Sequence, residues 1–267
     1  DKLVGANIEF EGVTVTGTEN LIMAASLAKG VSILTNVAKE PEILDLANFL
    51  NSMGAKISGA GTDKIIVEGV EELSGTTYEI PADRIEAGTY LIAGAITNGN
   101  ITINQIDPER MGAIIENLKK AGAEVISNEK SISLNMTNHI LKPVNIITAP
   151  FPGFPTDMQA QFTVLNCMGQ GESRVKETIF ENRFMHIQEL NRMGTNIRID
   201  GTTAIINGVD SISGAQVMAT DLRASASLIL AGLVAKGETI VDRIYHIDRG
   251  YERIEEKLSN LGAEILR

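Results

Sequence analysis

The sequence contains a single cysteine, Cys167, and only three histidines. One cysteine excludes an internal disulfide and a cluster of thiolate metal ligands. The histidines, His139, His186 and His246, are too far apart along the chain to show metal-ligand spacing. Cys167 lies in an apolar run, which predicts a buried core thiol rather than a reactive one. We therefore expect a cytosolic protein without a metal site.

Basic side chains are also scarce. Lys and Arg total 23 against 34 Asp and Glu, which gives a net charge of −11. A nucleic-acid-binding protein needs a basic face that replaces condensed counterions, so we do not expect this class. No apolar run approaches the length of a membrane span, and the start of the chain does not resemble a secretion signal. The 267 residues, 43% of them hydrophobic, suffice for one large domain or two modest ones.

An internal repeat of about 70 residues fills the sequence. Four similar segments read as a helix end that passes through a glycine into a strand, and a second glycine precedes each one. The closing glycines lie 68, 72 and 68 residues apart. A fixed period indicates one supersecondary unit in four copies. The closing glycines are Gly54, Gly122, Gly194 and Gly262, and the preceding ones are Gly30, Gly99, Gly171 and Gly237.

Each copy is expected to contain two helices with different surfaces. The helix before the closing glycine carries apolar residues along one face, such as Leu46, Leu50 and Met53. The earlier helix, such as residues 21–28, is apolar or small on all sides, which predicts a buried helix. Short β-rich runs lie between and after the helices. The unit therefore reads as strand, buried helix, strand, amphipathic helix, strand, strand, and the copies should pack around a pseudo-axis in an α/β fold.

Polar residues precede the buried helix in every copy. Asp83, Asp157 and Asp221 hold this place in three copies, and Thr14 and Gly17 hold it in the first. Asp and Thr are preferred N-caps, so capping is the simplest interpretation. Helix N-termini also offer unpaired N–H groups and partial positive charge, which favour anions. The first copy, with Thr and Gly rather than Asp, is the one best suited to accept a phosphate.

A second polar series precedes the amphipathic helix. It contains Arg110, Arg183 and Arg249, each after a strand end and beside a carboxylate or an amide. Arginines are usually solvated at the surface. Arginine is also the side chain that holds a carboxylate or a phosphate by two parallel hydrogen bonds. Asp and Arg at facing helix starts indicate a site for a small, multiply anionic substrate.

Three long motifs match a known family. They are FPTDMQAQF at residues 154–162, ENRFMH at 181–186, and ATDLRASAS with DRIYHIDRGYER at 219–227 and 242–253. Over its whole length the chain resembles the enolpyruvyl transferases, and among them the UDP-N-acetylglucosamine 1-carboxyvinyltransferases rather than their shikimate-pathway relatives. The resemblance implies an inside-out α/β barrel of two domains built from six copies of the unit, of which this chain contains four.

The resemblance also implies a reaction. The family transfers the enolpyruvyl group of phosphoenolpyruvate to the 3-hydroxyl of UDP-N-acetylglucosamine and releases phosphate, in the first committed step of bacterial peptidoglycan synthesis. It implies a cytoplasmic protein with no metal or organic cofactor and no nucleic-acid or membrane partner. Residues 1–81 would be the last repeat of the UDP-sugar-binding domain, and residues 82–267 would be the second, three-repeat domain.

Individual residues receive roles from the same resemblance. Asp157 resembles the carboxylate that binds the sugar 3-hydroxyl and removes its proton, and an attacking hydroxyl needs such a base. Arg249 resembles a phosphoenolpyruvate ligand and is expected to be catalytic with Asp157. By the same resemblance, the segment that holds the uridine diphosphate is Gly12, Val13, Thr14 and Val15, and the residue that contacts the uridine is Ile179. The second wall of the cleft, which closes over substrate, resembles Arg183, Asp221 and Arg223.

The chain departs from the family in its first third. The family's Lys–Asn pair, further arginines and a mobile loop with a reactive cysteine or aspartate have no counterpart in this sequence. We therefore expect that the chain alone does not turn over, and that its incomplete first domain self-associates through exposed apolar surface. A non-catalytic module that keeps affinity for the UDP-sugar is the alternative. A shikimate-type transferase, which binding of shikimate 3-phosphate would reveal, is a third interpretation.

Overall fold

The computed structural model describes residues 2–267. The chain divides into two compact units. The first contains the residues up to Pro81 together with Pro150–Gly153, and the second contains Ala82–Ala149 and Phe154–Arg267. Across residues 2–267, none of the helices has both the length and the apolar character that crossing a membrane requires.

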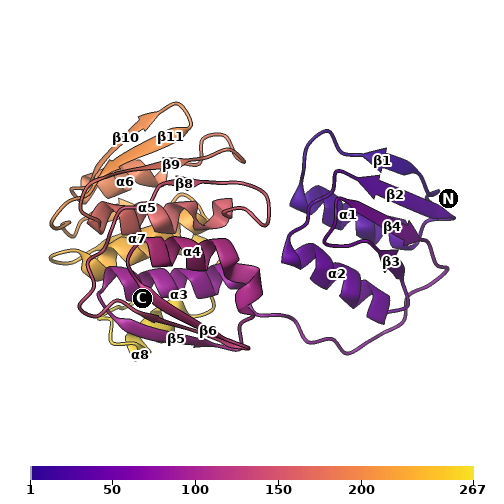
Figure 1. Cartoon of the computed structure of the whole chain (residues 1–267), viewed down its shortest axis with the longest axis horizontal. Coiled ribbons are helices and arrows are strands. Elements are labelled where there is room, and N and C mark those ends of the chain that lie inside the picture. The colour runs from indigo at the N-terminus through magenta and orange to yellow at the C-terminus, as the bar shows by residue number, and fades with distance from the viewer. Residues whose placement is uncertain (1) are drawn as a thin grey trace. The chain divides into compact units, whose positions relative to one another are not determined.

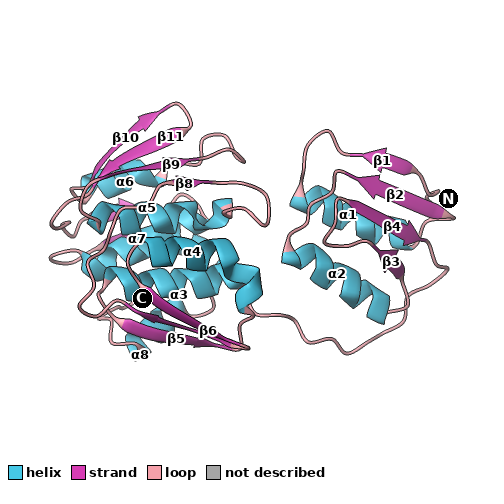
Figure 2. Cartoon of the chain, viewed as in Figure 1, coloured by secondary structure: helices cyan, strands magenta, loops and turns pink. Residues whose placement is uncertain are grey.

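The first unit contains one complete copy of the repeat (Figures 1 and 2). Its sheet has the strand order β1-β2-β4-β3, in which β1 is parallel to β2 and the other neighbours are antiparallel. Both helices pack against this sheet, and a small apolar core lies between the helices and the sheet. In chain order the elements are β1 (Asn7–Glu9), α1 (Val15–Ser26), β2 (Val31–Thr35), α2 (Pro41–Ser52), β3 (Lys56–Ser58) and β4 (Lys64–Glu68).

The second unit contains the other three copies. The first of these three, which is the second copy along the chain, starts directly with a helix. In chain order its elements are α3 (Arg84–Ile96), β5 (Asn100–Asn104), the 3₁₀ helix η1 (Pro108–Met111), α4 (Gly112–Lys120), β6 (Glu124–Asn128) and β7 (Ser131–Asn135).

The third copy is complete and the fourth is shorter. The third copy contains β8 (Ile146–Ile147), the 3₁₀ helix η2 (Thr156–Met158), α5 (Gln159–Met168), β9 (Glu172–Lys176), α6 (His186–Arg192), β10 (Asn196–Asp200) and β11 (Thr203–Asn207). The fourth contains β12 (Gln216–Met218), α7 (Leu222–Val234), β13 (Ile240–Asp242), the 3₁₀ helix η3 (Ile244–Arg249) and α8 (Ile254–Asn260).

Three helices, α3, α5 and α7, lie side by side at the centre of the second unit, and its sheets lie outside them (Figure 1). The sheet β8-β9-β11-β10 repeats the order and the directions of β1-β2-β4-β3. The other two sheets, β5-β7-β6 and β12-β13, are partial versions of the same plan. Helices α3 and α5 are buried along nearly their whole length, and α7 is buried over residues 224–231, as the apolar sequence predicts.

Two details of the expected unit are wrong. Among the described residues no strand lies between β4 and α3, and none follows α8. A strand needs a partner for its backbone N–H and C=O groups, and β-rich residues alone do not provide one. Helix α1, which the sequence predicts to be buried on all sides, also differs from this expectation, because its Met23 and Leu27 are 46% and 43% exposed. The sheet and α2 cover the opposite face of α1, which includes Ile22, whereas α3 has helical neighbours on two sides.

The closing glycines end their helices as the repeat predicts. Gly54, Gly122, Gly194 and Gly262 have φ angles of 102°, 100°, 93° and 103°. Residues with a Cβ rarely adopt this left-handed region, so glycine is needed where the chain turns from helix to strand.

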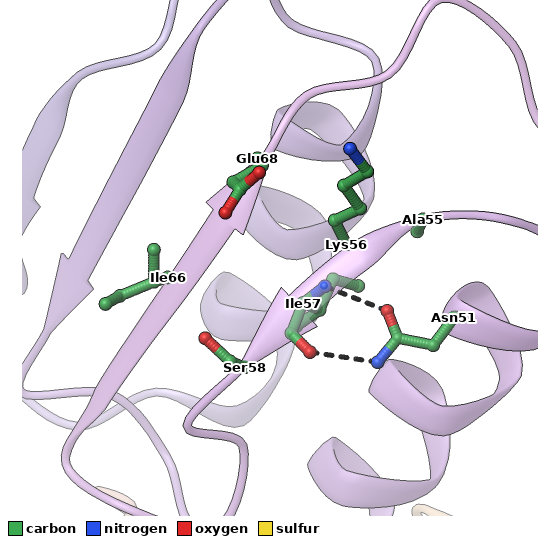
Figure 3. Close-up of a pocket in the computed structure, with 7 residues that line it drawn as sticks. All are labelled: Asn51, Ala55, Lys56, Ile57, Ser58, Ile66 and Glu68. Atoms are coloured by element: carbon green, nitrogen blue, oxygen red, sulfur yellow. Dashed lines mark hydrogen bonds between the residues drawn. The ribbon is translucent and has the colours of Figure 1, made fainter.

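An asparagine three residues before the closing glycine locks this turn in both complete copies. The Asn51 Nδ2 donates to the Ile57 carbonyl at 2.9 Å, and the Ile57 N–H donates back to the Asn51 Oδ1 at 2.8 Å (Figure 3). Asn191 and Ile197 form the same pair at 2.8 and 3.1 Å. The amide therefore replaces backbone partners that the helix end and the following strand lack.

A hollow of about 330 Å³ lies beside the Asn51 pair, between the end of α2 and the β3–β4 hairpin. Lys56, Ser58 and Glu68 line it from the strands (Figure 3). It contains none of the residues that the sequence selects for chemistry. The candidate site therefore has to be located from the side-chain contacts of those residues.

Candidate active site

The three aspartates at the central helix starts fall into two classes. Asp83 accepts hydrogen bonds from the Ile85 and Glu86 N–H groups at 2.7 and 3.1 Å and caps α3. Asp221 caps α7 in the same way, through two N–H groups at 2.8 and 2.9 Å. The capping interpretation is confirmed for these two residues. Asp157 lies within η2, makes no cap, and keeps its carboxylate for other partners.

Two arginines hold the Asp157 carboxylate. The Arg183 Nη2 lies 2.6 Å from its Oδ1, and the Arg223 Nη2 lies 2.7 Å from its Oδ2. Arg183 also donates to the Thr156 hydroxyl at 2.6 Å, and its guanidinium lies 4.8 Å from the centre of the Phe180 ring. Charge-assisted bonds of this length are strong and fix orientation. The second unit thus brings together three of the expected site residues.

The electrostatics of the cluster follow from this geometry. Burial alone would raise the pKa of Asp157, but the charges and hydrogen bonds of Arg223 and Arg183 outweigh burial and hold that pKa below its ordinary value. Burial would lower the pKa of Arg223, and its pairing with Asp157 raises that pKa instead. The Asp157 side chain remains 36% exposed. An incoming ligand can therefore reach a charged carboxylate flanked by two cations.

A buried polar network lies below Arg223. The Thr89 and Tyr251 hydroxyls are 2.8 Å apart, and the Gln161 Nε2 lies 3.2 Å from the first and 3.4 Å from the second. Thr89 comes from α3, Gln161 from α5 and Tyr251 from the segment after η3, and Tyr251 also interacts with Arg223. Hydrogen bonds between buried side chains restrict how the elements that carry them pack. This network supports Arg223 from inside the bundle.

The remaining arginines of the predicted series do not join the cluster. Arg110 pairs with Asp107, at 3.4 Å. Arg249 is exposed at the end of η3, and its neighbour Asp248 forms a double ion pair with Arg267. Within residues 2–267 no hydrogen bond or ion pair joins Arg249 to Asp157. The expected role of Arg249 in binding phosphoenolpyruvate therefore stays a prediction.

The other expected residues divide between the units. Ile179, 38% exposed, lies in the turn after β9, on the same short segment as Phe180 and Arg183. In the first unit Thr14 caps α1, and its hydroxyl accepts from the Gly17 N–H at 3.3 Å. Gly12 and Val13 before it are exposed, and a side chain at Gly12 would meet no atom within 4 Å.

Two buried titratable groups of the second unit have no role in the cluster. Cys167 is buried as expected, and burial raises the pKa of its thiol to about 12. Burial lowers the pKa of His186 to about 4; Asp221 raises that pKa and Arg183 lowers it further, each by a smaller amount. His186 is therefore neutral near pH 7. In the described part of the chain, no group of three or more His, Cys, Asp or Glu side chains is placed to hold a metal ion.

The depressed pKa of His186 predicts a pH dependence of stability. Between pH 6.5 and 4 the unfolded chain binds a proton at this residue and the folded chain does not, so stability falls as the pH falls through this window. We expect the free energy of unfolding to drop by about 2 kcal/mol less between pH 7 and pH 5 in His186→Gln than in the wild type. Urea unfolding at the two pH values measures this. His139→Gln, at an exposed position, should leave the drop unchanged.

The EPSP synthase family (3-phosphoshikimate 1-carboxyvinyltransferase) matches residues 1–258. The chain belongs to this family. The resemblance inferred from the three motifs is therefore confirmed.

Curated relatives in the family carry a more specific name. A UDP-N-acetylglucosamine 1-carboxyvinyltransferase from Hydrogenovibrio crunogenus is 61% identical over 267 residues, which are 100% of this chain and 64% of the relative. One of the same name from Coxiella burnetii is 59% identical over 266 residues, 100% of this chain and 61% of the relative. The chain thus spans less than two thirds of the length of these relatives.

Solved structures in the family have the same fold. The enolpyruvyl transferase NikO from Streptomyces tendae superimposes with a TM-score of 0.87 at 24% identity, covering 99% of this chain and 65% of NikO. An EPSP synthase from Acinetobacter baumannii superimposes with a TM-score of 0.71 at 19% identity, covering 98% and 63%. The expected α/β enolpyruvyl transferase fold is confirmed.

Several residues around the cluster were not predicted from the sequence. Thr156 and Tyr251 lie in two of the family motifs, and Gln161 lies in one of them, yet nothing in the local pattern selects them. Thr89 reads as one more small helix residue. Glu177 directly follows β9 and lies two residues before Ile179, and an acidic residue at a strand end near an expected ligand contact was the available signal.

Proposed function

We propose that this chain forms the larger part of an enzyme that transfers the enolpyruvyl group of phosphoenolpyruvate to the 3-hydroxyl of UDP-N-acetylglucosamine and releases phosphate. The observation that carries the proposal is the Asp157 carboxylate held between Arg183 and Arg223. A carboxylate accepts the proton of an attacking hydroxyl, and arginines bind the anionic groups of a phosphorylated substrate. The names of the curated relatives support the same reaction. In the cell it would serve peptidoglycan synthesis in the cytoplasm.

The low pKa of Asp157 adds a condition to this proposal. A carboxylate in two ion pairs is a weak base, because protonation would leave two cations without a partner. In the proposed reaction the phosphate and carboxylate of phosphoenolpyruvate compete for Arg183 and Arg223. As the guanidinium groups turn to the substrate, the pKa of Asp157 rises and the carboxylate becomes a better proton acceptor.

The other site residues keep the roles that the resemblance gives them, as part of the proposal. Residues 12–15 would bind the uridine diphosphate. Support comes from the start of α1, where a neutral hydroxyl cap leaves the positive helix end free for an anion, whereas carboxylates fill this place at Asp83 and Asp221. Ile179 would contact the uridine, Asp221 would lie in the wall of the site, and Arg249 would bind phosphoenolpyruvate.

The unit boundaries also enter the proposal. Residues 1–81 would be one repeat of a UDP-sugar-binding domain, and residues 82–267 would be a three-repeat domain. The exposed Met23 and Leu27 on α1 support an incomplete first domain that self-associates when the chain is alone. No cofactor is part of the proposed reaction.

A phosphate-release assay tests the proposed function. The chain is incubated with phosphoenolpyruvate and UDP-N-acetylglucosamine, first alone and then mixed with the N-terminal segment of a curated relative, a mixture that we call the reassembled enzyme. We expect no release by the chain alone and release by the reassembled enzyme, because the absent segment supplies further cationic groups and a catalytic loop in the resemblance.

Other outcomes of this assay point elsewhere. Release by the chain alone would show that Asp157, Arg183 and Arg249, together with the other site residues of this chain, suffice, and would contradict the expected inactivity. No release in either case, with UDP-N-acetylglucosamine bound in a calorimetric titration, would contradict the transferase and favour a non-catalytic UDP-sugar-binding module.

A further inference from the structure

Glu177 is a buried carboxylate outside the cluster of charged residues described above. It follows β9 and is only 2% exposed. Its Oε1 accepts hydrogen bonds from the Thr148 hydroxyl at 2.8 Å and from the Ile179 and Phe180 N–H groups at 2.8 and 3.2 Å. Its Oε2 accepts from the Thr156 hydroxyl at 2.8 Å. All four donors are neutral.

A buried acid with only neutral partners costs free energy that an apolar or amide side chain would not cost. Formation of the turn does not by itself explain a buried carboxylate, since the two bonds from the Ile179 and Phe180 N–H groups to Oε1 would already close the turn. The hydroxyls of Thr148 and Thr156 come from other segments of the second unit. Glu177 therefore ties three stretches of chain to one point.

The hydrogen bond from Thr156 connects Glu177 to Asp157, the base of the proposed reaction. The Thr156 Oγ1 accepts from the Arg183 Nη1 at 2.6 Å, so its own hydrogen is left to donate to Glu177. Arg183 in turn pairs with Asp157 at 2.6 Å through its other terminal nitrogen. The hydroxyl of Thr156 thus relays the orientation of Glu177 to the guanidinium and to the carboxylate.

The hydrogen bonds from the Ile179 and Phe180 N–H groups connect Glu177 to the turn that is expected to contact the nucleoside. Glu177 fixes the N–H groups of Ile179 and Phe180, and the Phe180 ring lies against the Arg183 guanidinium at 4.8 Å. Thr148 anchors the turn from the other side, where its hydroxyl accepts from the Thr178 N–H at 2.8 Å. One carboxylate therefore sets both the turn and the arginine.

We propose that Glu177 is a positioning residue, whose buried carboxylate holds Thr156 and the Ile179–Phe180 turn in one arrangement and so orients Arg183 toward Asp157. Its effect on turnover rests on the proposed function, in which Asp157 is the base and the turn contacts the nucleoside. Its effect on the Arg183–Asp157 pair does not rest on that function and can be measured without substrate.

The test compares Glu177→Gln with Glu189→Gln. Glu189 is a matched control, a largely buried glutamate in α6 of the same copy that accepts the Met218 N–H at 3.0 Å away from the cluster. The amide of Glu177→Gln puts an NH₂ group where one acceptor oxygen was. The pKa of Asp157 is followed by carbon NMR of the aspartate carboxyls in the full chain, with Asp157→Asn used for assignment. We expect this pKa to rise in Glu177→Gln and to stay at the wild-type value in Glu189→Gln.

Kinetics of the reassembled enzyme provide the second readout. We expect Glu177→Gln to lower kcat by about 10- to 100-fold, because small displacements of reacting groups have effects of this size. We also expect it to raise the KM for UDP-N-acetylglucosamine more than the KM for phosphoenolpyruvate. Thr156→Val should have a similar effect. The kcat of the double variant should be no lower than that of the more impaired single variant, because both changes break the same hydrogen-bonded connection.

Each outcome decides the proposal. An unchanged Asp157 pKa with a lower unfolding midpoint in Glu177→Gln would overturn it and leave Glu177 a purely structural role. If Glu177→Gln does not fold, Thr156→Val decides by the same NMR titration, since Thr156 is the link between Glu177 and Arg183. If the wild-type reassembled enzyme releases no phosphate, the proposed function fails, and the NMR titration still decides the positioning role.

Discussion

Asp157→Asn is expected to lower kcat for phosphate release by the reassembled enzyme by about 10²- to 10⁴-fold, the usual contribution of a positioned acid or base. Asparagine has nearly the same shape, and its Oδ1 still accepts from one of the two arginines. It cannot take up a proton from the sugar hydroxyl. The assay is phosphate release at saturating concentrations of both substrates.

A control and a contrary outcome sharpen this prediction. Asp200→Asn removes an exposed carboxylate at the end of β10 and should leave kcat within about twofold of the wild type, as surface changes away from special features usually do. A variant Asp157→Asn that keeps wild-type kcat would exclude Asp157 as the base. The Asp157, Arg183 and Arg223 cluster would then be an anion site alone.

Leu91→Ala is expected to lower the free energy of unfolding by about 2–5 kcal/mol, the range for leucine truncation in a packed core. Leu91 lies on α3 in the core of the second unit and is 0% exposed. Its removal leaves a cavity that the surrounding elements can close only in part. Urea unfolding followed by circular dichroism measures the change, because the sequence has no tryptophan.

Leu266→Ala is the matched control, with the same side chain and 99% exposure. We expect its free energy of unfolding to stay within about 0.5 kcal/mol of the wild type. Equal midpoints for both variants would contradict a core centred on the three helices.

The repeat made much of this fold predictable. Period, helix type and turn chemistry are local properties, and they agree at the closing glycines, all four of which adopt the left-handed backbone that was expected. Burial was harder to predict. The sequence of α1 is as apolar as that of α3, but burial needs neighbours on every side, and Met23 and Leu27 lack them in the described chain.

The site was predictable in part, for a related reason. Asp157, Arg183 and Arg223 were selected from the family motifs, and the structure brings them together. The local sequence could not show that Asp83 and Asp221 cap helices while Asp157 does not, because this depends on the 3₁₀ turn before α5. Contacts between copies, such as Thr89 with Tyr251, link residues 162 positions apart and leave no periodic trace in the sequence.

The asparagine pairs at the ends of α2 and α6 separate scaffold from chemistry within the unit. Asn51 and Asn191 secure the turn from helix to strand at one end of their copies, far along the chain from the polar residues that open the central helices. A change at a helix start can therefore leave this junction undisturbed. The two copies that contain this junction carry different helix starts, a threonine cap at Thr14 and an ion-paired aspartate at Asp157. Such a unit can acquire new chemistry by divergence while its architecture is inherited intact.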